Sequence, residues 1–321
     1  MSEIQGVAAP DTNKAIPLPC PSFPPNHPSL ETLRRWLPLY LKKTDHTLER
    51  LNSILSTPRG TDTLLLALCY TSLLTSSVLS SISLHRLRRA ARQIIEKVTA
   101  LPPNTTVIID TSSIPPSKLL IVAKRLKALS DLISDFRIFV QLWGLLGIWR
   151  WGKRTLENPQ QDVLVRMLVY SQVIVNVFYQ YLESGAYLSS KGVMGWSTEK
   201  QNKAWVWSSR FWMAHVGLDL VRLYRLLILR RNRGTEEEKR TDGPKGDVIT
   251  YRGEDELMAS WTKDVIINLA YAPLAVQWSL EKGLVGDFGV GLLGSVAGMA
   301  GLGALWRKTS SKYDTHGYEP F

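Results

Sequence analysis

Cysteine and histidine are scarce in this 321-residue sequence. The two cysteines, Cys20 and Cys69, have no spacing that suggests a disulfide framework or a metal site. The five histidines are scattered, without an HExxH motif or other paired ligand spacing. We therefore expect no metal site, and a reducing compartment is the simplest interpretation of the cysteine usage.

The short motifs of common catalytic and nucleotide-binding sites are also lacking. No GxSxG, P-loop or Cys-His pairing occurs. Gly289, Gly291 and Gly294 spell GxGxxG, but the surrounding stretch is apolar and no strand precedes it. Asp131 and Asp135 share a helix face four residues apart, where nearby cations favour an ion-pair network over acid-base catalysis. We therefore expect no cofactor, no catalytic residue and no enzyme activity.

We expect neither a secretory signal nor an Arg-rich transit peptide at the start of this sequence, and no SKL-type matrix signal at its end. The first 28 residues lack a basic segment followed by an apolar core, and the terminal Glu319-Pro320-Phe321 does not match an SKL-type signal.

Lys and Arg outnumber Asp and Glu by 39 to 28, and residues 61–160 carry 13 basic and 6 acidic side chains. Such a cationic region suits phosphate, whether of nucleic acid or of anionic lipid, so charge alone does not choose the partner.

What the sequence has in abundance is apolar residues at helical spacing. Hydrophobic residues make up 45% of the chain. Asp162 is expected to open a long helix through Tyr181, and residues 203–229 predict another. The charges Arg210, Asp219 and Arg222 within these apolar helices should pair with each other or face polar headgroups. These patterns predict an all-α fold.

A charge-free run from Thr63 to Leu84 leads into an amphipathic basic helix over residues 84–98. The run is rich in Ser and Thr, so we interpret it as a buried or half-inserted helix. The candidate membrane-binding residues of the helix after it are Leu84, Leu87, Arg88, Ala91, Arg92, Ile94, Ile95 and Val98, and the candidate contacts to anionic lipid are Arg86, Arg89 and Lys97. The alternative is an ordinary surface helix packing inward.

A second amphipathic pattern runs from Leu119 to Phe136 and is the other candidate for a membrane-inserting helix. It continues into a twelve-residue uncharged stretch, 138–149, that is short for a membrane span. The tryptophans near its end, Trp149 and Trp151, stand beside cations. They suit either a membrane-water interface or packing against a sibling helix.

The best spanning candidate is the stretch from Phe288 to Trp306, nineteen residues without a charge. At 1.5 Å per residue it would extend about 28 Å, close to the thickness of a bilayer core. Gly291, Gly294, Gly298 and Gly301 form a stripe that lets helix backbones approach in lipid. The basic residues that follow favour a cytosolic C-terminus. The chain is therefore expected to be a membrane-associated helical bundle with amphipathic helices and a Gly-rich C-terminal transmembrane helix.

Several strings occur in an order that resembles one known family. They are Gly60-Thr61-Asp62 leading to Tyr70; Ser134-Asp135-Phe136-Arg137 followed by Leu142-Trp143-Gly144; Tyr179, Glu183 and Tyr187-Leu188-Ser189; Trp205-Val206-Trp207-Ser208-Ser209-Arg210-Phe211-Trp212; Asn268-Leu269-Ala270-Tyr271-Ala272-Pro273; and Trp278-Ser279. Over roughly residues 29–308 the chain resembles the peroxin-11 family, most of all its fungal C-type branch.

The resemblance implies a peroxisomal membrane protein that elongates the membrane through an inserted amphipathic helix and promotes proliferation and fission. It also implies partners: an anionic phospholipid membrane, self-association and association with paralogues, and a dynamin-like fission machinery, with no nucleic acid. The alternative function is a pore or channel for small metabolites, with the Gly-stripe helix lining or packing it.

These interpretations divide the chain into five parts. Residues 1–28 are expected to be a disordered Pro-rich tail, 29–229 a peroxin-11-like membrane-associated region, 230–256 a polar linker, 257–308 a C-terminal helix with a hairpin-like transmembrane segment, and 309–321 a cytosolic tail.

Overall fold

The computed structural model describes residues 30–99, 118–240, 248–280 and 282–315, and these contain helices but no strand. The helices are α1 (Leu30–Leu55), α2 (Pro58–Thr99), α3 (Lys118–Gln141), α4 (Gly144–Glu157), α5 (Val163–Ser190), α6 (Thr198–Arg240), α7 (Val248–Ser279) and α8 (Asp287–Thr315). The predicted all-α, membrane-associated fold class is confirmed.

The chain divides into two compact units, residues 1–49 and 50–321. The described part of the first unit is the stretch of α1 that precedes Arg50. The second unit begins with the last residues of α1 and contains all the other helices. The surfaces and cavities considered below belong to the second unit.

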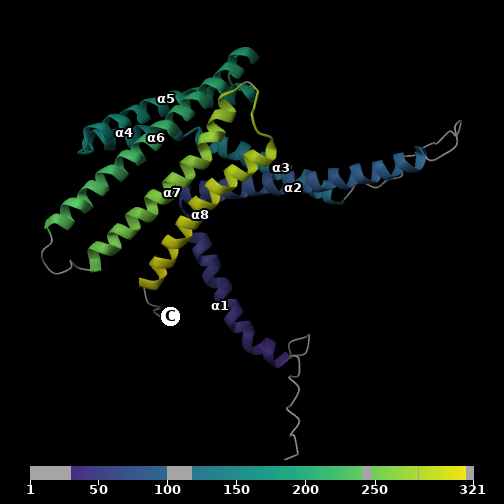
Figure 1. Ribbon diagram of the computed structural model, residues 1–321, viewed down its shortest axis with the longest axis horizontal. Helices are drawn as coiled ribbons and strands as arrows, with labels where there is room; N and C mark the ends of the chain where they lie inside the picture. The colour runs from purple at the N-terminus through teal and green to yellow at the C-terminus, as the bar shows by residue number, and fades with distance from the viewer. Residues whose placement is uncertain (1–29, 100–117, 241–247, 281, 316–321) are drawn as a thin grey trace, which may run out of the picture. The chain divides into compact units, whose positions relative to one another are not determined.

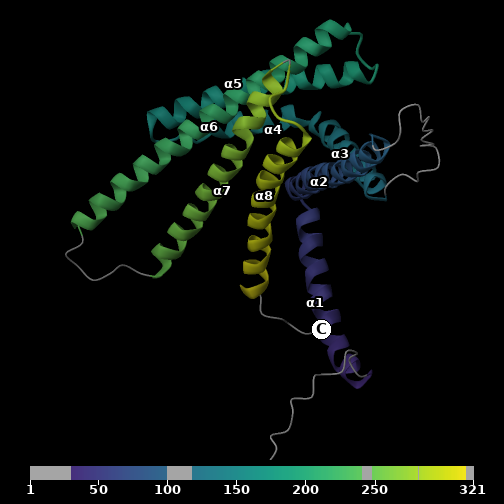
Figure 2. The same ribbon diagram turned by 45° about the vertical axis from the view of Figure 1, so that its right-hand side comes forward.

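The helices of the second unit pack in a closed cycle. Helix α3 lies against α2, α2 against α8, α8 against α7, α7 against α6, and α6 against α5, which in turn contacts α4 and α3. Figures 1 and 2 both show α5 beside α6 and α7 beside α8. The cycle closes around an interior that six of these helices line, as described below.

Local signals explain several helix ends. Asp162 caps α5, because its side chain accepts a hydrogen bond from the Val165 amide at 2.9 Å, which confirms the predicted helix start. Its carboxylate also pairs with Arg225 of α6 at 2.8 Å. A two-residue break, Leu142 and Trp143, separates α3 from α4, and the two helices meet at a bend of 52°.

Two predicted segments differ from the structure. The polar segment 230–256 was expected to be a linker, but α6 continues to Arg240 and α7 begins at Val248, so its described residues are helical. Glu, Lys and Arg are good helix formers, and their polarity alone does not end a helix. Likewise α8 runs on to Thr315, seven residues into the predicted C-terminal tail. The expected N-terminal tail, residues 1–28, lies outside the described residues.

Candidate functional site

The C-terminal part of α2 extends past the helix that packs on it. Ser76 donates to the Ala123 carbonyl of α3 at 2.7 Å, and further toward the start of α2 Cys69 lies 3.4 Å from the Ser130 carbonyl. The two helices are therefore antiparallel, and α3 begins opposite a point just before Leu84. Figure 1 shows this end of α2 reaching beyond α3 on the right.

Every described side chain from Leu84 to Glu96 is exposed. The apolar face is included, with Leu87 62% and Ile95 60% exposed. The predicted residues Arg86, Leu87, Arg88, Arg89, Ala91, Arg92, Ile94 and Ile95 all lie on this exposed extension, whereas the side chains of Lys97 and Val98 are outside the description. The structure thus brings these residues together as an uncovered amphipathic surface, and their role in membrane binding stays a prediction.

The second amphipathic candidate, in α3, is partly used for packing. Ala123, Ser130 and Ile133 are buried, while Val122 and Phe136 are exposed. One side of α3 therefore faces into the bundle, and only the other side is free to meet lipid.

The glycine stripe of α8 lies directly on α2. A Cβ atom at Gly291 would come within 2.8 Å of the Leu74 amide nitrogen, and one at Gly298 within 2.8 Å of the Ala67 Cα. One at Gly294 would overlap the ring of Tyr70, and one at Gly301 would lie 3.1 Å from Thr63 Cγ2. These glycines allow two long apolar helices of one chain to touch along their backbones, whereas their action inside a membrane stays a prediction.

Three helices of the described chain are long and apolar enough to cross a membrane, namely α2, α5 and α8, and the bent pair α3 and α4 passes the same test together. In the most apolar segment of each helix, only 17% of the residues of α2, 17% of those of α5 and 28% of those of α8 are buried inside the protein. Large apolar side chains such as Met167, Ile174 and Phe178 of α5 point outward. Because so much apolar surface is uncovered, these faces suit contact with lipid.

The interior of the helix cycle holds a cavity of about 870 Å³ lined from α2 through α7. Arg137 of α3 donates from Nε to Asp62 of α2 at 2.8 Å. On α5, the Tyr179 hydroxyl donates to Glu183 Oε1 at 2.8 Å, while Glu183 Oε2 is buried without a partner. Arg137, Tyr179 and Glu183 line the cavity together with Tyr70 of α2, so the sequence strings that contain these residues meet around it, which their positions in the chain did not predict.

Asp219 of α6 joins three helices at one end of this interior. Its carboxylate accepts hydrogen bonds from Arg222 Nε at 2.7 Å, Gln172 Nε2 at 2.8 Å and Asn268 Nδ2 at 2.8 Å. Burial alone would raise the pKa of Asp219, but these hydrogen bonds outweigh it and hold the pKa below its ordinary value. Of the three charges that the sequence predicted to pair with each other or to face headgroups, Asp219 and Arg222 form an ion pair. The partners on α5 and α7 carry no periodic signal in the sequence.

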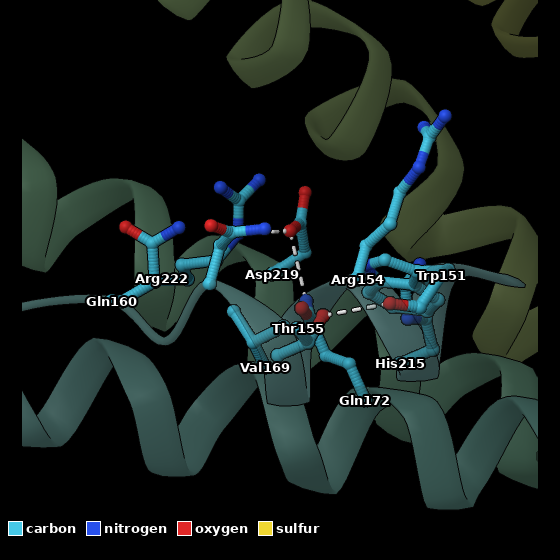
Figure 3. A pocket seen from close by; sticks show the side chains of 10 residues that line it. Trp151, Arg154, Thr155, Gln160, Val169, Gln172, His215, Asp219 and Arg222 are labelled. Atoms are coloured by element: carbon cyan, nitrogen blue, oxygen red, sulfur yellow. Dashed lines mark hydrogen bonds and ion pairs between the residues drawn. The ribbon is translucent and has the colours of Figure 1, made fainter.

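A smaller cavity of about 370 Å³ opens beside this carboxylate, between the end of α4, the start of α5 and α6. Figure 3 shows Arg222 and Arg154 flanking Asp219 there. His215 borders both cavities, and burial lowers its pKa. Its Nδ1 lies 2.8 Å from the Asn176 amide nitrogen, which makes the ring a neutral acceptor at that atom. Among the described residues no group of three His, Cys, Asp or Glu side chains is placed to hold a metal ion.

These observations define a membrane-associated helical protein with an exposed amphipathic extension and a polar interior. The sequence of residues 120–306, more than half of the chain, matches the family described as Peroxisomal biogenesis factor 11 (PEX11), and the chain belongs to this family. PEX11 proteins are peroxisomal biogenesis factors, so this chain belongs to a family of biogenesis factors rather than of enzymes. The matched segment begins in α3, so the extension of α2 lies outside it.

One curated protein is similar to this chain in sequence. An uncharacterized protein of Schizosaccharomyces pombe is 26% identical over 189 residues, which cover 59% of this chain and 75% of the relative. No solved structure matches this chain.

Proposed function

We propose that this protein elongates the peroxisomal membrane by inserting the apolar face of residues 84–98 into one leaflet, and so promotes peroxisome proliferation and fission. The observation that carries this proposal is the exposed amphipathic extension of α2, which has an apolar face and arginines and on which no helix of the described residues packs. Membership of the PEX11 family supports the peroxisomal membrane as the place of action.

The physical basis is a one-sided wedge. Fully burying an exposed Leu or Ile side chain stabilises by about 1.5–3 kcal/mol, and Leu87 and Ile94, which are 62% and 39% exposed, would each contribute a part of that on insertion. Arg86, Arg88 and Arg92 stand around them and can hold lipid phosphates at headgroup depth. Apolar volume added to one leaflet expands that leaflet alone, and the membrane curves.

The continuity of α2 limits how the wedge is placed. α2 has 42 residues, so it would be about 63 Å long at 1.5 Å per residue, twice the bilayer core. A straight α2 cannot both cross the membrane with its first half and lie in the interface with its second half. The proposal therefore requires either that α2 lies along the membrane throughout or that it bends near Leu84.

Spin labels on the full-length protein in liposomes test this placement. With the extension in the membrane plane, labels at Leu87 and Ile94 should report equal, shallow depths in a paramagnetic-quencher measurement. A spanning orientation would separate the two labels in depth by about 10 Å, since the two positions are seven residues apart in the helix. A separation of that size would contradict the in-plane wedge.

Full-length protein reconstituted into anionic liposomes tests the activity itself. We expect the double substitution Leu87→Glu and Ile94→Glu to reduce tubulation, seen by electron microscopy, at least about tenfold, because each carboxylate must then enter the apolar layer. Gln93→Glu is the control, since it adds one carboxylate on the polar face of the same exposed segment, and each single variant, Leu87→Glu or Ile94→Glu, matches it in charge. Equal tubulation by the double variant and the wild type would refute the wedge.

We also propose that this protein acts together with protein partners on the membrane. Self-association and association with paralogues would concentrate wedges on one membrane domain, and a dynamin-like machinery would cut the tubule that they form. Co-immunoprecipitation of this protein with such a GTPase from peroxisomal membranes checks the association. If peroxisomes elongate with the wild-type protein but never divide, a direct contribution to fission is excluded.

A second candidate function is a pore for small metabolites, which the cavity of about 870 Å³, with Arg137, Glu183 and Asp219 in its lining, favours. The glycine stripe faces α2 rather than this cavity, so bulky substitutions there would test packing and not conduction. Ser134 and Ser209 line the cavity instead. If the cavity conducts, Ser134→Phe or Ser209→Phe should lower single-channel conductance in planar bilayers severalfold, whereas unchanged conductance would exclude this route.

A further inference from the structure

We propose that the smaller cavity, between the end of α4, the start of α5 and α6, binds the phosphate group of an anionic phospholipid. We name it the Arg154 cleft, after the guanidinium at its edge; its other wall residues used here are Gln160, Gln172, His215, Asp219 and Arg222. This site is separate from the extension of α2 and does not depend on the wedge.

The charge of the cleft favours an anion. Arg154 makes no ion pair in the described part of the chain. Arg222 uses Nε on Asp219, which leaves its terminal nitrogens as further donors. Asp219 is the one carboxylate among the residues lining the cleft, and its oxygens already accept three hydrogen bonds. The two guanidinium groups therefore leave a net positive charge beside donors such as the Gln160 amide.

The location of the cleft suits a lipid. The candidate span of α5 begins at Val163, directly after the segment that contributes Gln160. Gln172 lies nine residues further along, about 14 Å deeper if α5 crosses the bilayer, so the cleft descends from headgroup level along the span.

The cavity of about 370 Å³ is large enough for a phosphate and part of a glycerol backbone, and it is half-open rather than sealed. A guanidinium binds phosphate through two parallel hydrogen bonds, which a lysine cannot reproduce. Arg154 therefore acts as the main phosphate contact, with Arg222 as its counterpart across the cleft.

Calorimetric titration of full-length protein in a neutral detergent tests the proposal. The probes are dioctanoyl phosphatidic acid, dioctanoyl phosphatidylcholine and inorganic phosphate. We expect saturable binding of phosphatidic acid that Arg154→Gln weakens at least about tenfold, with Arg154→Lys intermediate. Arg150→Gln, an exposed arginine of the same helix that does not line the cleft, should bind as the wild type does.

The remaining arms separate the possible sources of the phosphate. Binding of phosphatidic acid without competition by inorganic phosphate assigns the site to a lipid headgroup, whereas equal competition assigns it to a free phosphate, and both support an anion site. Equal binding by Arg154→Gln and wild type overturns the proposal, as does equal binding of phosphatidylcholine. The Leu87→Glu and Ile94→Glu variant should keep this binding while losing tubulation, so the two proposals fail independently.

Discussion

Gly298→Val is expected to loosen the contact of α8 with α2 and to lower the free energy of unfolding by about 3 kcal/mol or more. The Cβ atom alone would lie 2.8 Å from the Ala67 Cα, and the added methyl groups would push into the backbone of α2. Backbone atoms cannot move aside as the end of a flexible side chain can, so the helices must separate and lose contacts along the whole stripe. Far-ultraviolet circular dichroism during SDS titration in mixed micelles measures the loss.

The matched control is Gly303→Val in the same helix. Gly303 is exposed, and a Cβ there meets nothing within 4 Å. Since valine is the better helix former of the two, this variant should unfold at the same or a slightly higher SDS concentration than the wild type. Equal destabilisation by both variants would show that the penalty comes from valine in the helix and not from the contact with α2.

The sequence predicted what depends on local pattern. The cap at Asp162, the long apolar helix after Asp287 and the amphipathic face around Leu87 are each encoded within a few turns of one helix, and the structure contains all three helices. The glycine stripe likewise shares one face because its spacing follows the helical period. Family membership was also readable, because it rests on the order of local strings.

The polar interior could not be predicted in the same way. Asp62 and Arg137 are 75 residues apart, and Asp219 lies 47 residues from Gln172 and 49 from Asn268. Each side chain alone looks like an isolated polar residue on an apolar helix. The packing of α2 on α3, and of α5, α6 and α7 on one another, decides which of them meet, and that packing depends on long-range contacts that have no period in the sequence.

The polar segment 230–256 shows what a prediction from charge leaves open, because its described residues are helical. Its charges indicated solvent exposure, which is compatible with a helix as well as with a loop, and α6 and α7 both extend into it. Charge predicts where a segment lies relative to water, whereas helix propensity and neighbouring turns decide its conformation.

Asp219→Asn should destabilise the bundle by about 3 kcal/mol, because a buried or half-buried ion pair that loses one partner leaves the other uncompensated. The new amide group would face the donors of Gln172 or Asn268, so at least one of these hydrogen bonds is lost, and Arg222 loses its counter-charge. The volume of the side chain is unchanged, so the effect reports the charge and not a cavity. Three helices should loosen together, as measured by SDS titration.

Glu199→Gln is the control in the same helix. Glu199 pairs with Lys203 at the surface, where its side chain is 78% exposed. Such a pair contributes about 0–1 kcal/mol, so this variant should unfold nearly as the wild type does. If the Asp219→Asn variant were as stable as Glu199→Gln, the Asp219 carboxylate would not be what holds α5, α6 and α7 together.

The pH dependence gives an independent test of the same carboxylate. Because the folded pKa of Asp219 lies below its ordinary value, its contribution to stability is complete above the unfolded pKa of about 3.9 and is lost as the pH falls through the lower folded pKa. Wild-type stability should therefore fall more steeply below about pH 4 than that of Asp219→Asn, which has no carboxyl to protonate there. Identical acid dependence of the two proteins would show that Asp219 is not held ionised by Arg222, Gln172 and Asn268.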